Sequence, residues 1–128
     1  MKLSVAMITM NEERILEKTL ESVKDIADEI VIVDSGSSDR TEEIAKKYGT
    51  KFYVESWKGY GPQRNSAIDK ASGEWILNID ADEEISPELQ KKILEIKSST
   101  DDRSVNSPYK GWEYLKECIR KLDKDKYE

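Results

Sequence analysis

The sequence predicts an α/β fold built on a doubly wound, mostly parallel sheet. Short and almost continuously apolar segments alternate with segments of helical spacing, and the connections between them are short. Continuous apolar runs are typical of strands that are buried on both faces of a parallel sheet. With 128 residues, the chain is long enough for a domain with a substantial core.

The first half of the chain shows this alternation clearly. Strands are expected at residues 3–10, 29–33 and 52–54. Asn11 is expected to cap the first helix, with acidic residues in the first turn, where they favour the helix dipole. Residues 34–39 form a turn with several candidate caps for the second helix, and Gly49 is a natural stop for it.

In the second half, residues 59–62 are expected to form a loop before a helix from about residue 63 to 71. A buried strand at 75–79 follows, and Ser86 with Pro87 starts another helix. A polar segment from residue 97 to 107 divides the chain into a domain, 1–97, and a linker with a C-terminal helix, 98–128. That helix should line one face with Tyr109, Trp112, Leu115, Ile119 and Leu122.

Composition excludes several kinds of protein. The net charge of −6 gives no general attraction to nucleic acid or to anionic membranes. Histidine is absent, which removes imidazole bases and His-containing zinc sites, and the single cysteine, Cys118, excludes an internal disulfide. The sequence has no apolar run long enough to span a membrane and no signal-peptide pattern. We therefore expect a soluble, cytoplasmic protein.

Polar residues follow three of the expected strands. Ligands of doubly wound sheets bind outside the carboxyl ends of the strands, near the point where the strand order reverses. We therefore expect a ligand site where these three groups of residues meet. They are Thr9, Asn11 and Glu12 at the carboxyl end of the first strand, Asp34, Ser35 and Gly36 at the end of the second, and Asp80 and Asp82 at the end of the strand at 75–79.

The sequence Asp80-Ala81-Asp82 suggests a metal site. Side chains two residues apart on an extended chain point to the same side, so both carboxylates would face one spot. Close carboxylates repel each other unless a cation lies between them, and hard oxygen ligands suit Mg²⁺ or Mn²⁺. The alternative is a solvated acidic loop leading into the helix at Ser86.

Taken together, these segments resemble the family 2 inverting glycosyltransferases of the GT-A fold, whose donor half is a Rossmann-like nucleotide-binding unit. Within that family they resemble the branch that includes lipopolysaccharide-core glucosyltransferases. The resemblance runs from Leu3 to about Ile96. It is carried by the stretches SVAMITMNE, VIVDSGSSDRT, QRN and ASGEWILNIDADE, in this order and spacing.

The resemblance implies a nucleotide-diphospho-sugar donor, usually a UDP-sugar, and a divalent metal. It implies transfer with inversion to a glycan or lipid acceptor of the cell envelope, with contact to the membrane only at its periphery. Asp34 would bind the base, and Asp82 would ligate the cation that bridges the phosphates, with Asp80 near the ribose or the metal. The other nucleotide-binding positions would be Thr9, Asn11, Glu12, Ser35, Gly36 and Arg64.

The sequence departs from the family pattern in two places. Many relatives have a second acid where this chain has Ser35, which leaves the choice of nucleotide open. Family enzymes also continue well past the Asp-x-Asp motif, so we expect this chain to lack the acceptor-side half. Glu83 and Glu84 match no family motif for a catalytic base, which stays unassigned. Arg64 could equally be an exposed arginine at a helix start.

Two other functions remain open at this point. One is a shortened, non-catalytic module or subunit that binds the nucleotide-sugar, and an exposed sheet edge on it would favour a homodimer. The other is a phosphoacceptor receiver, another doubly wound domain with an acidic Mg²⁺ pocket. A receiver needs a lysine at the end of a late strand, and no expected strand ends in lysine.

Overall fold

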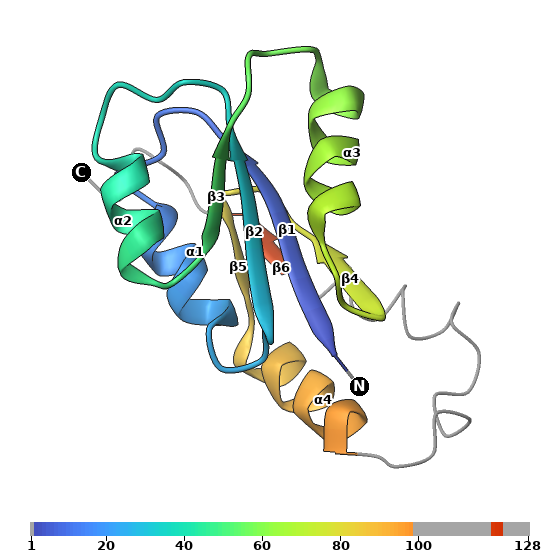
Figure 1. The fold of residues 1–128 in the computed structure, drawn as a ribbon. Helices are drawn as coiled ribbons and strands as arrows, with labels where there is room; N and C mark the ends of the chain where they lie inside the picture. Colours follow the sequence, from blue (N-terminus) through green and yellow to red (C-terminus); the bar gives the residue numbers. More distant parts are fainter. Residues whose placement is uncertain (1, 99–118, 122–128) are drawn as a thin grey trace.

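A computed structural model describes residues 2–98 and 119–121 (Figure 1). The described residues form an α/β unit in which strands and helices alternate, as the sequence predicts. The elements are β1 (Leu3–Thr9), α1 (Leu16–Val23), β2 (Glu29–Asp34), α2 (Thr41–Lys47), β3 (Lys51–Val54), α3 (Tyr60–Lys70), β4 (Trp75–Asn78), β5 (Glu83–Ile85), α4 (Pro87–Ser98) and β6 (Ile119–Lys121).

The main sheet has the strand order β3-β2-β1-β4, and its three strand pairs are all parallel. The chain builds outward from β1 through β2 to β3 and then returns to add β4 on the other side of β1. The strand order therefore reverses between β1 and β4. The carboxyl ends of these two strands define the edge at which such sheets bind ligands.

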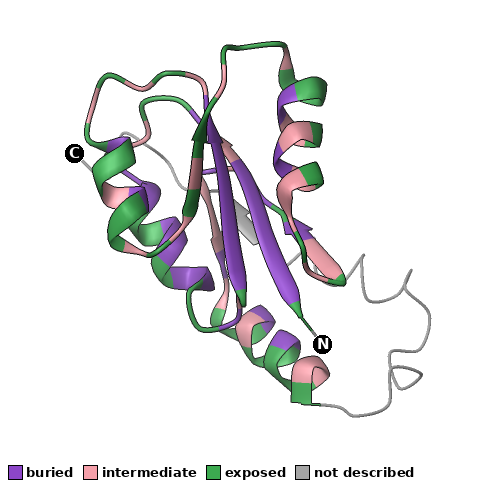
Figure 2. Cartoon of the chain, viewed as in Figure 1, coloured by how far each residue is buried: buried purple, intermediate pink, exposed green. Residues whose placement is uncertain are grey.

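Helices cover both faces of this sheet, which confirms the doubly wound prediction. Val5 and Met7 of β1 belong to the larger core cluster, together with α1, α2, α4 and β5. Ala6, the residue between them, packs on the opposite face with Val33 and with Ala67 of α3. Figure 2 shows β1 and β2 buried along nearly their whole length, with α3 on one side of the sheet and α1 and α2 on the other.

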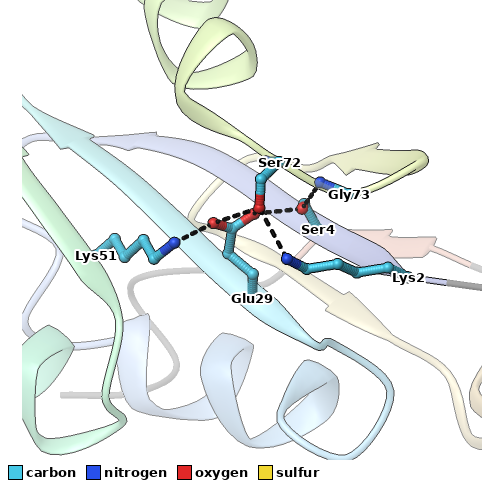
Figure 3. Close-up of polar contacts among 6 residues, drawn as sticks. All are labelled: Lys2, Ser4, Glu29, Lys51, Ser72 and Gly73. Carbon is cyan, nitrogen blue, oxygen red and sulfur yellow. Dashed lines mark hydrogen bonds and ion pairs between the residues drawn. The ribbon is translucent and has the colours of Figure 1, made fainter.

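A buried carboxylate fastens the amino ends of the strands (Figure 3). Glu29, at the start of β2, accepts hydrogen bonds from Ser4 of β1, Lys51 of β3 and Ser72 before β4. Burial alone would raise the pKa of Glu29, but the bonds from Lys51, Ser4 and Ser72 outweigh it and lower the pKa to about 2. The backbone N–H of Gly73 donates to Ser4 Oγ at 2.9 Å, which adds the α3–β4 connection to the cluster.

Two helix starts differ from the prediction. Helix α1 begins at Leu16 rather than directly after Asn11, whose positive φ of 52° is not helical. The Asn11 backbone N–H donates to Ser37 Oγ instead, and its Oδ1 accepts from the Ser38 N–H, so Asn11 joins two loops. Helix α3 begins earlier than predicted, at Tyr60. Pro62 is compatible with this start, because it falls in the first turn, where a helix does not need the N–H that proline lacks.

The region after β4 also differs from the prediction. Strand β5 was not predicted; it pairs antiparallel with β6 at residues 119–121. The prediction of a C-terminal helix is therefore wrong at these three residues, where the chain is extended. Residues 107–118 and Leu122 of that predicted helix lie outside the described residues. No helix in the described part of the chain is both long and apolar enough to cross a membrane.

Candidate functional site

A cavity of about 640 Å³ opens at the carboxyl ends of β1, β2 and β4. It lies at the edge where the strand order reverses, which is the place the fold predicts for a ligand. Its volume falls in the range of about 300–1,000 Å³ that is usual for small-molecule sites. The lining residues are Ile8, Thr9, Met10, Glu12, Ser35, Trp57, Tyr60, Arg64, Asp80, Ala81 and Asp82.

The structure brings most of the predicted site residues to this cavity. Those that line it are Thr9, Glu12, Ser35, Arg64, Asp80 and Asp82. Asn11, Asp34 and Gly36 are not among the lining residues. Asp34 ends β2, and Asn11 and Gly36 lie in the loops that follow β1 and β2. These loops form one wall of the site through Met10, Glu12 and Ser35.

Asp34 organises these loops from inside. It is the last residue of β2, and its side chain is buried. Its carboxylate accepts four hydrogen bonds, from the Thr9 hydroxyl at 2.6 Å, the Gly36 N–H at 2.8 Å, and the N–H and hydroxyl of Ser37, both at 2.6 Å. A carboxylate offers about four acceptor positions, so Thr9 and the loop after β2 together use the capacity of Asp34.

Asp80 and Asp82 reach the cavity by a turn rather than on an extended strand. Strand β4 ends at Asn78, and the Glu83 N–H donates to the Asp80 carbonyl at 3.0 Å. Between the two acids, Ala81 is buried, and its carbonyl accepts from the Thr19 hydroxyl of α1 at 2.6 Å. This anchor holds Ala81 against α1 while both neighbouring aspartates line the cavity.

Arg64 lies on the α3 side of the same cavity. Its guanidinium donates to Asp80 Oδ1 at 2.9 Å, and its Cζ lies 5.8 Å from the centroid of the Tyr60 ring. The side chain therefore joins the acidic turn after β4 to the start of α3. Arg64 lines the cavity, and its side chain is 41% exposed near the start of α3, so its role in binding stays a prediction.

Sequence reasoning missed the aromatic residues of the site. Trp57 and Tyr60 line the cavity and contact each other edge to face, with ring centroids 4.9 Å apart. The signal in the sequence is the segment Trp57-Lys58-Gly59-Tyr60, which connects the carboxyl end of β3 to α3. Two aromatic residues in such a connection are candidates for ligand contact, because that edge of the sheet carries the site.

The two aspartates suit a metal that is shared with a ligand. Within residues 2–98 and 119–121, no group of three or more Asp, Glu, His or Cys side chains converges to enclose an ion. Mg²⁺ is commonly held by one or two carboxylates and completes its shell with substrate phosphates and water. Asp80 and Asp82 together fit that arrangement, in which the ligand brings the remaining oxygens.

Comparison with known proteins assigns the family. Residues 4–107 match the family described as Glycosyl transferase family 2. The chain belongs to this family. An uncharacterized glycosyltransferase of Rickettsia bellii is 49% identical over 92 residues, which are 72% of this chain and 31% of the relative. The lipopolysaccharide core biosynthesis glycosyltransferase LpsC of Rhizobium meliloti is 38% identical over 128 residues, covering 92% of this chain and 47% of LpsC.

Solved structures of similar fold support the GT-A assignment. TarS of S. aureus (residues 1–349) aligns with a TM-score of 0.61 and 33% identity, covering 76% of this chain and 32% of TarS. TarS has also been solved in complex with UDP, with a TM-score of 0.59 and 30% identity. Glucosyl-3-phosphoglycerate synthase from Mycobacterium tuberculosis, solved with Mn²⁺, UDP and glucosyl-3-phosphoglycerate, aligns at 0.53 and 29% identity, covering 64% of this chain and 34% of the synthase. This family 2 chain thus spans about a third to a half of these relatives.

Proposed function

We propose that this chain provides the donor-binding part of a glycosyltransferase and binds a nucleotide-diphospho-sugar, a UDP-sugar, together with Mg²⁺ or Mn²⁺. The observation that carries the proposal is the cavity at the β1–β4 switch point, with Asp80 and Asp82 in its lining. The solved relatives support the choice of ligand, because TarS has been solved with UDP and the synthase with UDP and Mn²⁺. Residues 1–97 would form this binding unit.

Different residues of the cavity would bind the cation and the nucleoside. Asp80 and Asp82 would hold the cation, which when bound stabilises the negative charge of the departing diphosphate as a Lewis acid. Arg64, already paired with Asp80, adds a positive charge on that side of the site. The remaining polar lining, Thr9, Glu12 and Ser35, would meet the nucleoside, while Asn11, Asp34 and Gly36 shape the loops beneath it.

The finer parts of the proposal concern the transfer itself. We propose transfer with inversion to a glycan or lipid acceptor of the cell envelope, in the cytoplasm and at most at the membrane periphery. The similarity to LpsC supports this class of acceptor. Inversion requires an acceptor hydroxyl in line with the leaving group and a carboxylate base. That base stays unassigned, and Glu83 is a poor candidate because its Oε1 already accepts from the Asp80 N–H at 2.6 Å.

Calorimetric titration of UDP, GDP and UDP-glucose, with and without Mn²⁺, tests the proposal. Wild type should bind UDP more tightly with Mn²⁺, and Asp82→Asn should lose that metal-dependent gain because a neutral amide is a weaker cation ligand. Asp69→Asn is the matched control, since Asp69 is an exposed residue of α3 that does not line the cavity. Wild type that binds none of these ligands, or Asp82→Asn that keeps the full metal effect, would refute the proposal.

A sugar-transfer assay on the same samples separates enzyme from binding module. Release or transfer of glucose supports the transferase, whereas metal-dependent binding without turnover supports the non-catalytic module. The short coverage of the relatives keeps this second function in consideration. The homodimer also remains a proposal, with β3 and β4 as the outer strands of the four-stranded sheet, and light scattering of the chain in solution would test it.

A further inference from the structure

The aromatic pair that lines the cavity, Trp57 and Tyr60, has no role in the core. Trp57 is 51% exposed and Tyr60 is 67% exposed, and neither belongs to a buried cluster. Their rings nonetheless hold a defined arrangement, with an angle of 88° between the ring planes. Aromatic faces that line a cavity are suited to stack against the ring of a ligand.

A single buried side chain fixes the segment that carries Trp57. Gln63 of α3 is completely buried, although glutamine is usually exposed. Its Nε2 donates to the Glu55 carbonyl at 3.1 Å, and its Oε1 accepts from the Lys58 N–H at 3.2 Å. The amide therefore holds the backbone on both sides of Trp57. A buried polar group left without a partner costs free energy. The two hydrogen bonds of the Gln63 amide therefore strongly favour one conformation of the segment.

Glu55 fastens the same segment a second time. Its carboxylate pairs with Lys58 and Lys70, each at 2.7 Å, and accepts from the Ser66 hydroxyl at 2.7 Å. Hydrogen bonds from Lys58, Lys70 and Ser66 lower the pKa of Glu55 to about 2, so the carboxylate is charged at neutral pH. The Glu55 N–H also donates to the Asp34 carbonyl at 2.8 Å. The segment is thus attached both to α3 and to the end of β2.

Arg64 connects the aromatic pair to Asp80. Arg64, the residue after Gln63, lies 5.8 Å from the Tyr60 ring centroid and pairs with Asp80. A ligand whose diphosphate lies near Asp80 would therefore have one of its rings within reach of this pair. Both the nucleobase and the sugar of a nucleotide-diphospho-sugar present a ring face of the required kind.

We propose that Trp57 and Tyr60 form a ring-binding wall of the cavity and that Gln63 is the positioning residue that holds this wall in place. The inference rests on the proposed nucleotide-sugar function and extends it to residues outside the predicted site. A wall that is fixed before the ligand arrives improves affinity, because little conformational entropy is lost on binding.

Alanine variants test the wall by titration with UMP, UDP and UDP-glucose in the presence of Mn²⁺. Trp57→Ala and Tyr60→Ala should each raise Kd by about 5- to 150-fold, the range expected for loss of one ring–aromatic stack. Tyr53→Ala is the matched control, because Tyr53 is an exposed aromatic of β3 that does not line the cavity. Its affinities should equal those of wild type.

The three ligands identify the ring. Equal weakening for all three supports contact with the nucleobase, and weakening for UDP-glucose alone supports contact with the sugar. Unchanged affinity of both variants for every ligand overturns the wall, while wild type still binds and Asp82→Asn still loses its metal effect. Wild type that binds no ligand overturns the proposed function, and this inference with it.

A double-mutant cycle tests whether Gln63 acts through the wall. Gln63→Met keeps the side-chain length but removes both hydrogen bonds, and should raise Kd by about tenfold in wild type yet less than about twofold in Trp57→Ala. Gln90→Met is the control, since the Gln90 amide also donates to a backbone carbonyl, that of Ile85, but on α4. An equal effect of Gln63→Met in both backgrounds would overturn the positioning role, because a merely structural loss would be additive.

Discussion

Gly73 occupies the tightest position among the glycines of the described chain. A Cβ added there would lie 2.6 Å from Ser4 Oγ and 2.9 Å from two backbone atoms, Ser4 N and Lys2 O. The backbone neighbours cannot move aside without disturbing β1. Only glycine fits at position 73, because the α3–β4 connection passes so close to β1 that a Cβ would clash with it.

The Gly73→Ala variant should be less stable than wild type by about 1–3 kcal/mol, the usual cost of overpacking. Urea unfolding followed by circular dichroism would measure the difference. Gly61→Ala is the matched control: a Cβ there meets nothing within 4 Å, and Gly61 lies in α3. Because a Cβ at Gly61 meets no atom outside its chain neighbours, this control should lose less stability than Gly73→Ala. Equal stability of the two variants would contradict the assignment.

At the scale of elements, the loops after β1 and β2 form one hydrogen-bonded unit. The Asn11 N–H donates to Ser37 Oγ, the Ser38 N–H donates to Asn11 Oδ1, and the Glu12 N–H donates to Thr41 Oγ1. The site wall thus depends on contacts between segments about 26 to 29 residues apart. Asp34, the last residue of β2, accepts from Thr9 at the end of β1 and from Gly36 and Ser37 in the loop after β2.

Replacing Asp34 by Asn should cost about 1–3 kcal/mol, because the buried Thr9 hydroxyl and the part-buried donors of Gly36 and Ser37 lose part of their acceptor. Hydrogen exchange at residues 35–38 should become faster, since the Gly36 and Ser37 N–H groups bond directly to this carboxylate. Asp69→Asn again serves as control and should leave exchange in this loop unchanged. Unaltered protection in Asp34→Asn would show that the backbone alone holds the loop.

At the scale of the whole molecule, Glu29 links stability to pH. Its pKa is lowered from 4.5 to about 2 in the folded chain. A lowered pKa means that the folded state holds the proton less tightly than the unfolded state. The contribution of Glu29 is therefore fully present above about pH 4.5 and is lost as the pH falls toward 2.

Glu29→Gln should weaken the fall in unfolding free energy between about pH 4.5 and pH 2, relative to wild type. Urea unfolding at a series of pH values in that window would measure the two slopes. Glu74→Gln, at an exposed position, is the charge-matched control and should keep the wild-type slope. Parallel curves for wild type and Glu29→Gln would refute the role of this cluster in the acid response.

Features that depend on nearby residues could be predicted from the sequence, whereas features that depend on distant residues could not. The alternation of strands and helices, the stop at Gly49 and the start of α4 at Ser86 were readable because caps and apolar periodicity act within one or two turns. Ser86 indeed accepts from the Leu89 N–H at 3.1 Å. The start of α1 was not readable, because Asn11 exchanges its local capping role for bonds to a loop about 26 residues away.

The doubly wound fold and the meeting of polar residues at one edge could be predicted from the sequence, because strand periodicity and the rule for parallel sheets need no distant contacts. Three further features depend on contacts that form only in the folded chain. They are the turn that carries Asp80 and Asp82 and is anchored by Thr19, the pairing of β5 with β6, and the position of Trp57 at the cavity, on a segment held by the buried Gln63. Each depends on hydrogen bonds or pairings between segments that must first fold together, and such contacts leave no periodic pattern in the chain.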